Sequence, residues 1–259
     1  MGFIAIDIGN TTTKIALVEK DIKNILRLNS NARMDLENCL DIIKKAFGDS
    51  VFEGSIISSV VPEKTPFFVD ILNNISERPP VILDHETYTG IKIRLKNPET
   101  LGADRIANAV AAYDIAYGKA VVVDFGTATT TTVINDKGEI ICGTIMPGVG
   151  MMFQALAEKT GRLPQIIPGS PVKEIGRDTR SSIISGITYG TAGAVERILE
   201  EIERDAGRCA IIVTGGNAAF IREFLRFKHL YVEDLTLRGL KLILERNRYE
   251  SAKKRAFTG

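Results

Sequence analysis

The fold of this chain is decided by two stretches, GFIAIDIGNTTTKIALVEK at residues 2–20 and KAVVVDFGTATTTTVINDK at residues 119–137. They align without a gap, so that Asp7 falls on Asp124 and the glycine two residues later is also shared. Each stretch reads as an apolar strand ending in Asp-x-Gly, a turn rich in hydroxyl residues, and a second run with β-branched residues. The pattern predicts two β-hairpins and therefore a duplicated architecture.

The remaining sequence predicts strands and helices in both halves. Apolar spacing indicates helices over 35–47, 103–117 and 189–206 and strands over 55–61 and 210–214. We therefore predict an α/β fold with one domain over residues 1–117 and a second over residues 118–259. The second domain includes a basic tail from residue 246, for which we expect a solvated terminus.

The 259 residues have an ordinary globular composition, with 44% hydrophobic and 25% charged residues. Lys plus Arg (33) nearly balance Asp plus Glu (32), so the charge indicates neither a nucleic-acid partner nor binding to an anionic membrane. No apolar run approaches the ~18 residues of a membrane span. The three cysteines are far apart, which argues against a zinc site and favours a reducing, cytoplasmic location.

The Asp-x-Gly turns have the chemistry of a phosphate site. An ionised aspartate at the end of an apolar strand needs a partner, which a cation or a phosphate-bound metal would supply. The glycine lets a ligand approach the backbone, whose successive N–H groups can surround phosphate oxygens, and Lys14 and the nearby threonines add donors. Because a second strand follows the turn instead of a helix, the segment is neither a Walker A loop nor a dinucleotide fingerprint.

A single Asp-x-Gly is equally compatible with a plain structural turn. A third glycine turn occurs at residues 214–216, where a predicted strand ends in Gly-Gly and leaves room for a base or ribose. The two aligned copies and this third turn together favour nucleotide binding.

Asp104 lies at the start of a predicted helix, in Gly102-Ala103-Asp104-Arg105. Asp is a common N-cap residue, and by frequency this interpretation is the more common one. A carboxylate in this place can also accept the proton of a substrate hydroxyl while the adjacent arginine holds an anionic group. Asp104→Asn separates the two roles, because asparagine caps a helix as well as aspartate does but is no base.

Several motifs together resemble the type III pantothenate kinases: DIGNTTTK at 7–14, SSVVP at 58–62, NPETLGADR at 97–105, DFGTAT at 124–129, Pro-Gly at 147–148 and Thr-Gly-Gly at 214–216. The similarity runs in order over roughly residues 3 to 240. It implies the fold of the actin-like ATPase superfamily (acetate and sugar kinases, heat-shock ATPases and actin), with two ribonuclease H-like domains. It also implies ATP-dependent phosphorylation of pantothenate to 4′-phosphopantothenate, the first step of coenzyme A synthesis.

The resemblance assigns roles to individual residues. Asp104 would accept the proton of the substrate hydroxyl, and Asp124 would bind a monovalent cation, K⁺ or NH₄⁺. Mg²⁺ would accompany ATP, and the enzyme would be a homodimer. The residues implied to bind ATP are Asp7, Ile8, Gly9, Asn10, Thr11, Thr12, Thr13, Lys14 and Thr127, with Thr129 as an alternative to Thr127. Those implied to bind pantothenate are Gly102, Ala103, Asp104, Arg105 and Thr179.

Two other functions fit the same motifs. One is a regulatory accessory protein that senses nucleotide without turnover, although the near-neutral charge argues against direct DNA contact. The other is a kinase or phosphohydrolase for a different small substrate, because fold does not fix function. The intact Gly-Ala-Asp-Arg segment favours pantothenate over both.

Overall fold

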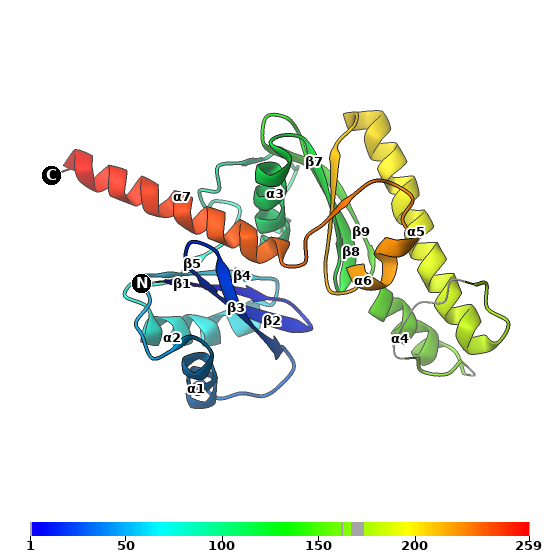
Figure 1. Ribbon diagram of the computed structural model, residues 1–259, viewed down its shortest axis with the longest axis horizontal. Coiled ribbons are helices and arrows are strands. Elements are labelled where there is room, and N and C mark those ends of the chain that lie inside the picture. The colour runs from blue at the N-terminus through cyan, green and yellow to red at the C-terminus, as the bar shows by residue number, and fades with distance from the viewer. Residues whose placement is uncertain (1, 162, 167–173, 259) are drawn as a thin grey trace. The chain divides into compact units, whose positions relative to one another are not determined.

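The computed structural model describes residues 2–161, 163–166 and 174–258, with side chains as far as residue 248. The chain forms two compact units, Met1–Ile115 with Leu235–Gly259, and Ala116–Asp234. Each unit combines a sheet with helices, which confirms the predicted α/β class (Figure 1).

The sheet of the first unit has the strand order β3-β2-β1-β4-β5. The antiparallel part is β1 (Phe3–Ile8), β2 (Thr12–Val18) and β3 (Ile22–Asn29). The strands β4 (Ser55–Ser59) and β5 (Val81–Ile82) continue the sheet parallel to β1. The first predicted hairpin is therefore confirmed, and β4 lies directly beside its first strand.

The other elements of the first unit are the helices α1 (Leu36–Phe47), α2 (Thr65–Ile75), α3 (Ala103–Ala116) and α7 (Leu235–Thr258), the 3₁₀ turns η1 (Pro62–Lys64) and η2 (Pro98–Thr100), and the short strand β6 (Lys92–Ile93). The isoleucines of β1 that point to one face of the sheet, Ile4, Ile6 and Ile8, pack with residues of α1 and α2 in one apolar core. This burial fixes the register of the hairpin, because a slip by one residue would turn all three outward.

The helix α7 belongs to the first unit, whereas the predicted division assigned residues 118–259 to one domain. It packs against β1 and β4, and Leu240 and Ile243 are fully buried. Gly239 meets α3 so closely that a Cβ there would lie 1.9 Å from the Ala107 carbonyl oxygen. Such long-range packing leaves no local signal in the sequence.

The expected solvated tail is in part tied down. The backbone is helical as far as Thr258. Arg248 lies over the Phe3 ring, 4.2 Å from its centroid, and its Nη2 is 2.8 Å from Glu53 Oε2. Arg246 donates to the Thr89 carbonyl. At least these two basic residues of the tail are held by the first unit, and the prediction is wrong for them.

Within the second unit the strands run in the order β9-β8-β7-β10-β11. This repeats the order β3-β2-β1-β4-β5 of the first sheet, with β7 in the place of β1. They are β7 (Ala120–Phe125), β8 (Ala128–Ile134), β9 (Glu139–Pro147), β10 (Ala210–Thr214) and β11 (Leu230–Tyr231). The pair β7 and β8 is the second predicted hairpin, and β10 runs parallel to β7 as β4 does to β1. The predicted duplication is confirmed.

The helical elements of the second unit are α4 (Val149–Lys159), α5 (Thr179–Ala206), α6 (Ala218–Ile221) and the 3₁₀ turn η3 (Arg222–Phe224). The helix α5 begins ten residues before the predicted start at Tyr189. Its true start is a capping box, in which the Asp178 side chain accepts from the Ser181 amide at 2.9 Å. Gly186 lies within the part of the helix that was not predicted, residues 179–188, and glycine has a low helix propensity.

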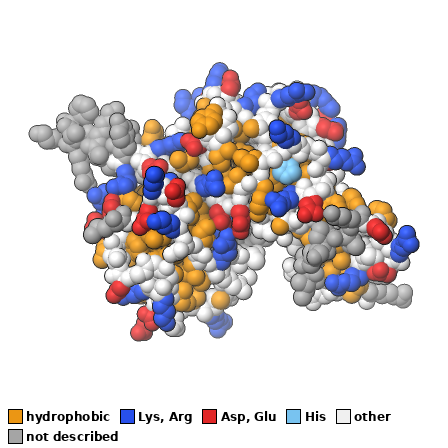
Figure 2. Space-filling view, in the orientation of Figure 1, with side chains coloured by type: hydrophobic (Ala, Val, Ile, Leu, Met, Phe, Trp, Pro, Cys, Tyr) orange, Lys and Arg blue, Asp and Glu red, His pale blue; other side chains and the backbone are white. Residues whose placement is uncertain are grey.

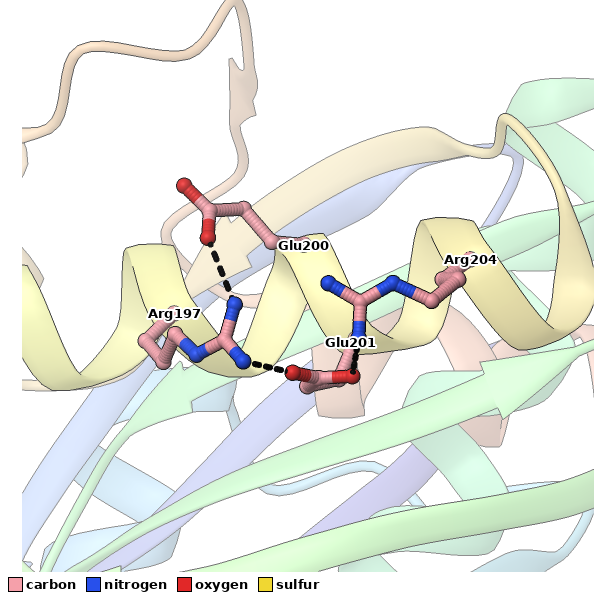
Figure 3. A network of polar contacts seen from close by, with 4 residues as sticks. All are labelled: Arg197, Glu200, Glu201 and Arg204. Atoms are coloured by element: carbon pink, nitrogen blue, oxygen red, sulfur yellow. Dashed lines mark hydrogen bonds and ion pairs between the residues drawn. The ribbon is translucent and has the colours of Figure 1, made fainter.

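The exposed face of α5 carries ion pairs at helical spacing (Figure 3). Arg197 Nη1 is 3.1 Å from Glu200 Oε2, and Glu201 pairs with both Arg197 and Arg204. Exposed pairs of this kind contribute little to stability, because solvent screens them. Figure 2 shows cationic and anionic side chains interspersed over the visible face, in line with the balanced composition.

Candidate active site

The first Asp-x-Gly turn joins β1 to β2. Asp7 pairs with Lys14 and Ile8 with Thr13 in the antiparallel register. The Gly9 amide donates to the Thr12 carbonyl at 3.1 Å, and a Cβ at Gly9 would lie 3.0 Å from the same oxygen. The turn is thus tight, as the sequence predicted, and only a glycine fits it easily.

The predicted ATP-binding residues of this turn differ in what they can offer. Asn10 and Thr11 are exposed, and Thr12 and Lys14 are half-buried. The Ile8 side chain is fully buried, so Ile8 can contribute only through its backbone. Thr13 is also buried, and its hydroxyl lies 2.9 Å from the hydroxyl of Ser30. Its side chain therefore serves the fold of the turn.

Asp7 receives a hydrogen bond from the neighbouring strand. The Ser58 hydroxyl, fully buried on β4, donates to Asp7 Oδ1 at 3.2 Å. Ser58 is opposite Asp7 in the parallel register. The partner that an aspartate at a strand end requires is thus supplied in part by Ser58, which belongs to the quoted segment 58–62 but had no predicted role.

Asp104 is the second residue of α3, so it does not precede the helix and the N-cap interpretation is wrong. Its Oδ1 accepts from the Arg105 amide at 2.8 Å. Burial raises the pKa of Asp104, opposed by this hydrogen bond and by the Arg105 charge. Groups with shifted pKa values cluster at functional sites, so Asp104 is a candidate site residue.

Gly102 makes room for this carboxylate. A Cβ at Gly102 would lie 2.5 Å from Asp104 Oδ1 and 3.4 Å from Val60 Cγ1. The second contact brings the Gly-Ala-Asp-Arg segment against the residue that follows β4. Asp7, Ser58 and Asp104 are therefore held by elements that meet within the first unit. Ala103 is buried, so it can contribute only through its backbone.

The second Asp-x-Gly turn joins β7 to β8. Asp124 pairs with Thr130, and the Gly126 amide donates to the Ala128 carbonyl at 3.1 Å. The Gly148 amide donates to the Thr127 carbonyl at 3.1 Å, and the Asn217 side chain donates to the Gly126 carbonyl at 3.1 Å. Two segments distant in sequence therefore hold this turn.

The third glycine turn lies beside the second one. Thr214 is opposite Asp124 in the parallel register of β10 and β7. Gly215 has φ +101°, and a Cβ there would lie 2.4 Å from Asp124 Oδ1. The sequence predicted the chemistry of both turns, and the structure adds that the glycine makes room for the aspartate.

The alternative between Thr127 and Thr129 is narrowed by burial. Thr127 is exposed, whereas Thr129 is only 1% exposed. The Thr129 hydroxyl has no hydrogen-bond partner within the described part of the chain. Thr127 is therefore the accessible hydroxyl of the pair. Thr179 is the exposed first residue of α5, directly after the cap Asp178.

The described residues contain no cluster of metal ligands. Over residues 2–161, 163–166 and 174–258, no group of three or more His, Cys, Asp or Glu side chains could hold a metal ion. Asp124 is a single carboxylate beside a turn, and the Gly126 and Thr127 carbonyls of that turn accept hydrogen bonds from Asn217 and Gly148. A divalent ion with few protein carboxylates is typically carried by the phosphates of its nucleotide.

A family model described as type III pantothenate kinase matches residues 3–201, which include both Asp-x-Gly turns and the Gly-Ala-Asp-Arg segment. The chain belongs to this family. A type III pantothenate kinase from Dehalococcoides mccartyi is 34% identical over 252 residues, covering 95% of this chain and 96% of the relative. The predicted family is confirmed, and the chain is a kinase that uses ATP with a divalent metal.

Solved structures show the same fold. A protein from Campylobacter jejuni, described as a conserved Baf family transcriptional activator, aligns with a TM-score of 0.61 at 21% identity over 95% of this chain and 99% of its own. The ethanolamine utilization protein EutJ from Carboxydothermus hydrogenoformans aligns with a TM-score of 0.56 at 15% identity, over 93% of this chain and 89% of its own. These likenesses confirm the actin-like ATPase fold. No helix in the described residues is long and apolar enough to span a bilayer.

Proposed function

We propose that the chain transfers the γ-phosphoryl group of ATP to the hydroxyl of pantothenate and so makes 4′-phosphopantothenate, the first step of coenzyme A synthesis. The observation that carries the proposal is Asp104, a partly buried carboxyl whose pKa is raised by burial, within the Gly-Ala-Asp-Arg segment of a type III pantothenate kinase. Family membership supports pantothenate as the substrate, and the burial of Asp104 supports its role as the base.

Phosphoryl transfer needs little covalent chemistry from the protein, which mainly positions the reactants and offsets charge. The turn at Asp7–Lys14 offers backbone N–H groups and the Lys14 ammonium to the phosphates of ATP, and Thr127 adds a hydroxyl. Asp104 accepts the proton of the pantothenate hydroxyl as the bond to phosphorus forms. Gly102, Ala103, Arg105 and Thr179 bind pantothenate, with the Arg105 guanidinium available to its carboxylate.

Asp124 is the proposed ligand of a monovalent cation, K⁺ or NH₄⁺. Such an ion, when bound, complements the negative charge of the phosphates. Mg²⁺ accompanies ATP. Two further features complete the proposal: the enzyme is a homodimer, which rests on the family resemblance alone, and it acts in the cytoplasm, which rests on the widely separated cysteines.

The pH dependence follows from Asp104. Because burial raises its pKa, the carboxyl becomes a competent base at a higher pH than an exposed aspartate would. We expect kcat/KM for pantothenate to fall as the pH is lowered through this raised pKa, and to level off above it. A pH–rate profile without an acidic limb would contradict the assignment.

The deciding experiment is mass spectrometry of the reaction of pantothenate with ATP and Mg²⁺, in potassium and in sodium buffers. We expect a phosphorylated product in potassium, less of it in sodium, and a loss of at least about 10²-fold in kcat for Asp104→Asn. No product from a folded wild-type protein that still binds ATP would instead favour the nucleotide sensor or another substrate.

The stability of Asp104→Asn is the control. Because the folded-state pKa of Asp104 is raised, its ionised carboxylate lowers stability at any pH above that value, and asparagine removes this cost. We therefore expect a Tm at neutral pH equal to or above that of the wild type. A large fall in Tm would mean that lost activity reflects unfolding.

A further inference from the structure

Ser30 lies beside the first phosphate turn, although it comes directly after β3 and shares no motif with that turn. It is 8% exposed. Its hydroxyl donates to the Gly9 carbonyl at 2.7 Å, and its amide donates to the Thr11 carbonyl at 3.0 Å. The hydroxyl also lies 2.9 Å from that of Thr13. One small residue therefore holds both ends of the turn.

The two carbonyls determine how the turn presents its N–H groups. A trans peptide is planar, with its C=O and N–H pointing in opposite directions. When Ser30 fixes the Gly9 and Thr11 carbonyls, it also fixes the next two amides, those of Asn10 and Thr12, on the side away from itself. Backbone N–H groups that are held in a common direction can bind phosphate oxygens.

Ser30 is itself held in place from another segment. The Lys64 ammonium donates to the Ser30 carbonyl. Lys64 is the last residue of η1, which follows Ser58 and Ser59 of β4. This lysine is far from the phosphate motifs in sequence, and its charge is directed to a backbone oxygen.

We propose that Ser30, held by Lys64, is a positioning residue that preorganises the Gly9–Thr12 turn for the phosphates of ATP. The inference rests on the proposed kinase function, but only for the identity of the nucleotide. A preorganised turn binds phosphate without the free-energy cost of ordering its backbone. Loss of the Ser30 hydrogen bonds to the turn therefore weakens nucleotide binding. It leaves pantothenate binding unchanged, because the Ser30 hydroxyl contacts only Gly9 and Thr13 among the described residues.

The test compares Ser30→Ala with Ser76→Ala. Ser76 is a matched control, since its hydroxyl donates to Ser55 at 3.2 Å, at the other end of β4. We expect Ser30→Ala to raise the Kd of the Mg²⁺ complex of a non-hydrolysable ATP analogue, and the KM for ATP, about tenfold. The KM for pantothenate should stay within about twofold, and Ser76→Ala should leave both constants within the same margin.

An unchanged nucleotide affinity in Ser30→Ala would overturn the proposal. So would an equal rise in both KM values together with a fall in Tm, since that is the signature of a general loss of structure. If Ser30→Ala does not fold, Lys64→Met decides: it leaves the serine hydroxyl in place, and the proposal requires it to weaken ATP binding about threefold or more. If the wild type makes no phosphopantothenate, the kinase proposal fails, but calorimetry of nucleotide binding still decides the role of Ser30.

Discussion

The two Asp-x-Gly hairpins share their register and their neighbouring strands but are held by different residues. The Gly9 carbonyl accepts from the Ser30 hydroxyl, and the corresponding Gly126 carbonyl accepts from the Asn217 side chain. Ser30 follows β3, whereas Asn217 follows β10. The duplication has therefore kept the carbonyl that is held, while the residue that holds it comes from a different place in each unit.

The two aspartates differ in the same way. Asp7 accepts from the Ser58 hydroxyl of the adjacent parallel strand. At the equivalent position beside Asp124, the Thr214 hydroxyl donates to the Glu233 carbonyl at 3.3 Å, and the next residue is Gly215 with positive φ. The Ser58 hydroxyl thus contacts the first aspartate, whereas the second aspartate lies so close to Gly215 that no side chain fits there.

The largest expected effect that tests this contrast is that of Gly215→Ala. The new Cβ would lie 2.4 Å from Asp124 Oδ1 and 2.5 Å from the Phe125 carbonyl carbon, at a φ that alanine avoids. We expect a loss of about 2–4 kcal/mol in the free energy of unfolding and loss of stimulation by potassium.

Chemical denaturation and assays in potassium and sodium measure these two effects. Gly216→Ala is the control for stability, because nothing lies within 4 Å of its Cβ position. If both variants unfolded alike, the close approach of Gly215 to Asp124 would have no special role.

A smaller effect is expected for Asn217→Ala, which removes the side-chain donor to Gly126. If Asn217 holds the second turn as Ser30 holds the first, this change should raise the KM for ATP about five- to tenfold, because one hydrogen bond is lost. Steady-state kinetics on Asn217→Ala and Ser30→Ala, in parallel, make the comparison. If Asn217→Ala binds ATP as the wild type does, ATP binding depends on a side-chain hydrogen bond only at the first turn.

The smallest effect, and of opposite sign, is expected for Thr129→Val. Its buried hydroxyl has no partner in the described structure, so valine should raise the free energy of unfolding by about 1 kcal/mol. Thr131 is equally buried, but its hydroxyl lies 2.9 Å from that of Thr144 and accepts from the Thr144 amide. Thr131→Val should therefore destabilise. Thermal unfolding of both variants measures these effects. A Tm of Thr129→Val below that of the wild type would contradict the predicted stabilisation.

Local pattern was enough to predict the hairpins and the α/β class. The alternation of apolar residues sets the strand faces, and Asp-x-Gly sets the turn, so neither depends on distant partners. The helix α1 was equally readable, since its cap Asp35 and its apolar spacing are both local.

The residues that hold the two turns could not be predicted from local pattern. Ser30 and Asn217 are common polar residues, and only the completed sheets bring them to their glycine carbonyls. The N-cap interpretation of Asp104 was wrong, because the Arg105 and Ile106 amides donate to the Gly102 carbonyl and the helix therefore begins before Asp104. The membership of α7 in the first unit depends on its close packing at Gly239, which no periodicity reveals.

The position of α7 has a consequence for synthesis on the ribosome. The second unit, Ala116–Asp234, is continuous in sequence, so all of its strands and helices emerge from the ribosome before α7 does. The first unit has its sheet early but must wait for the last helix of the chain to cover β1 and β4. Because domains fold as units, the unit made second is complete first. Until α7 emerges, the first unit exposes the surface that this helix later buries.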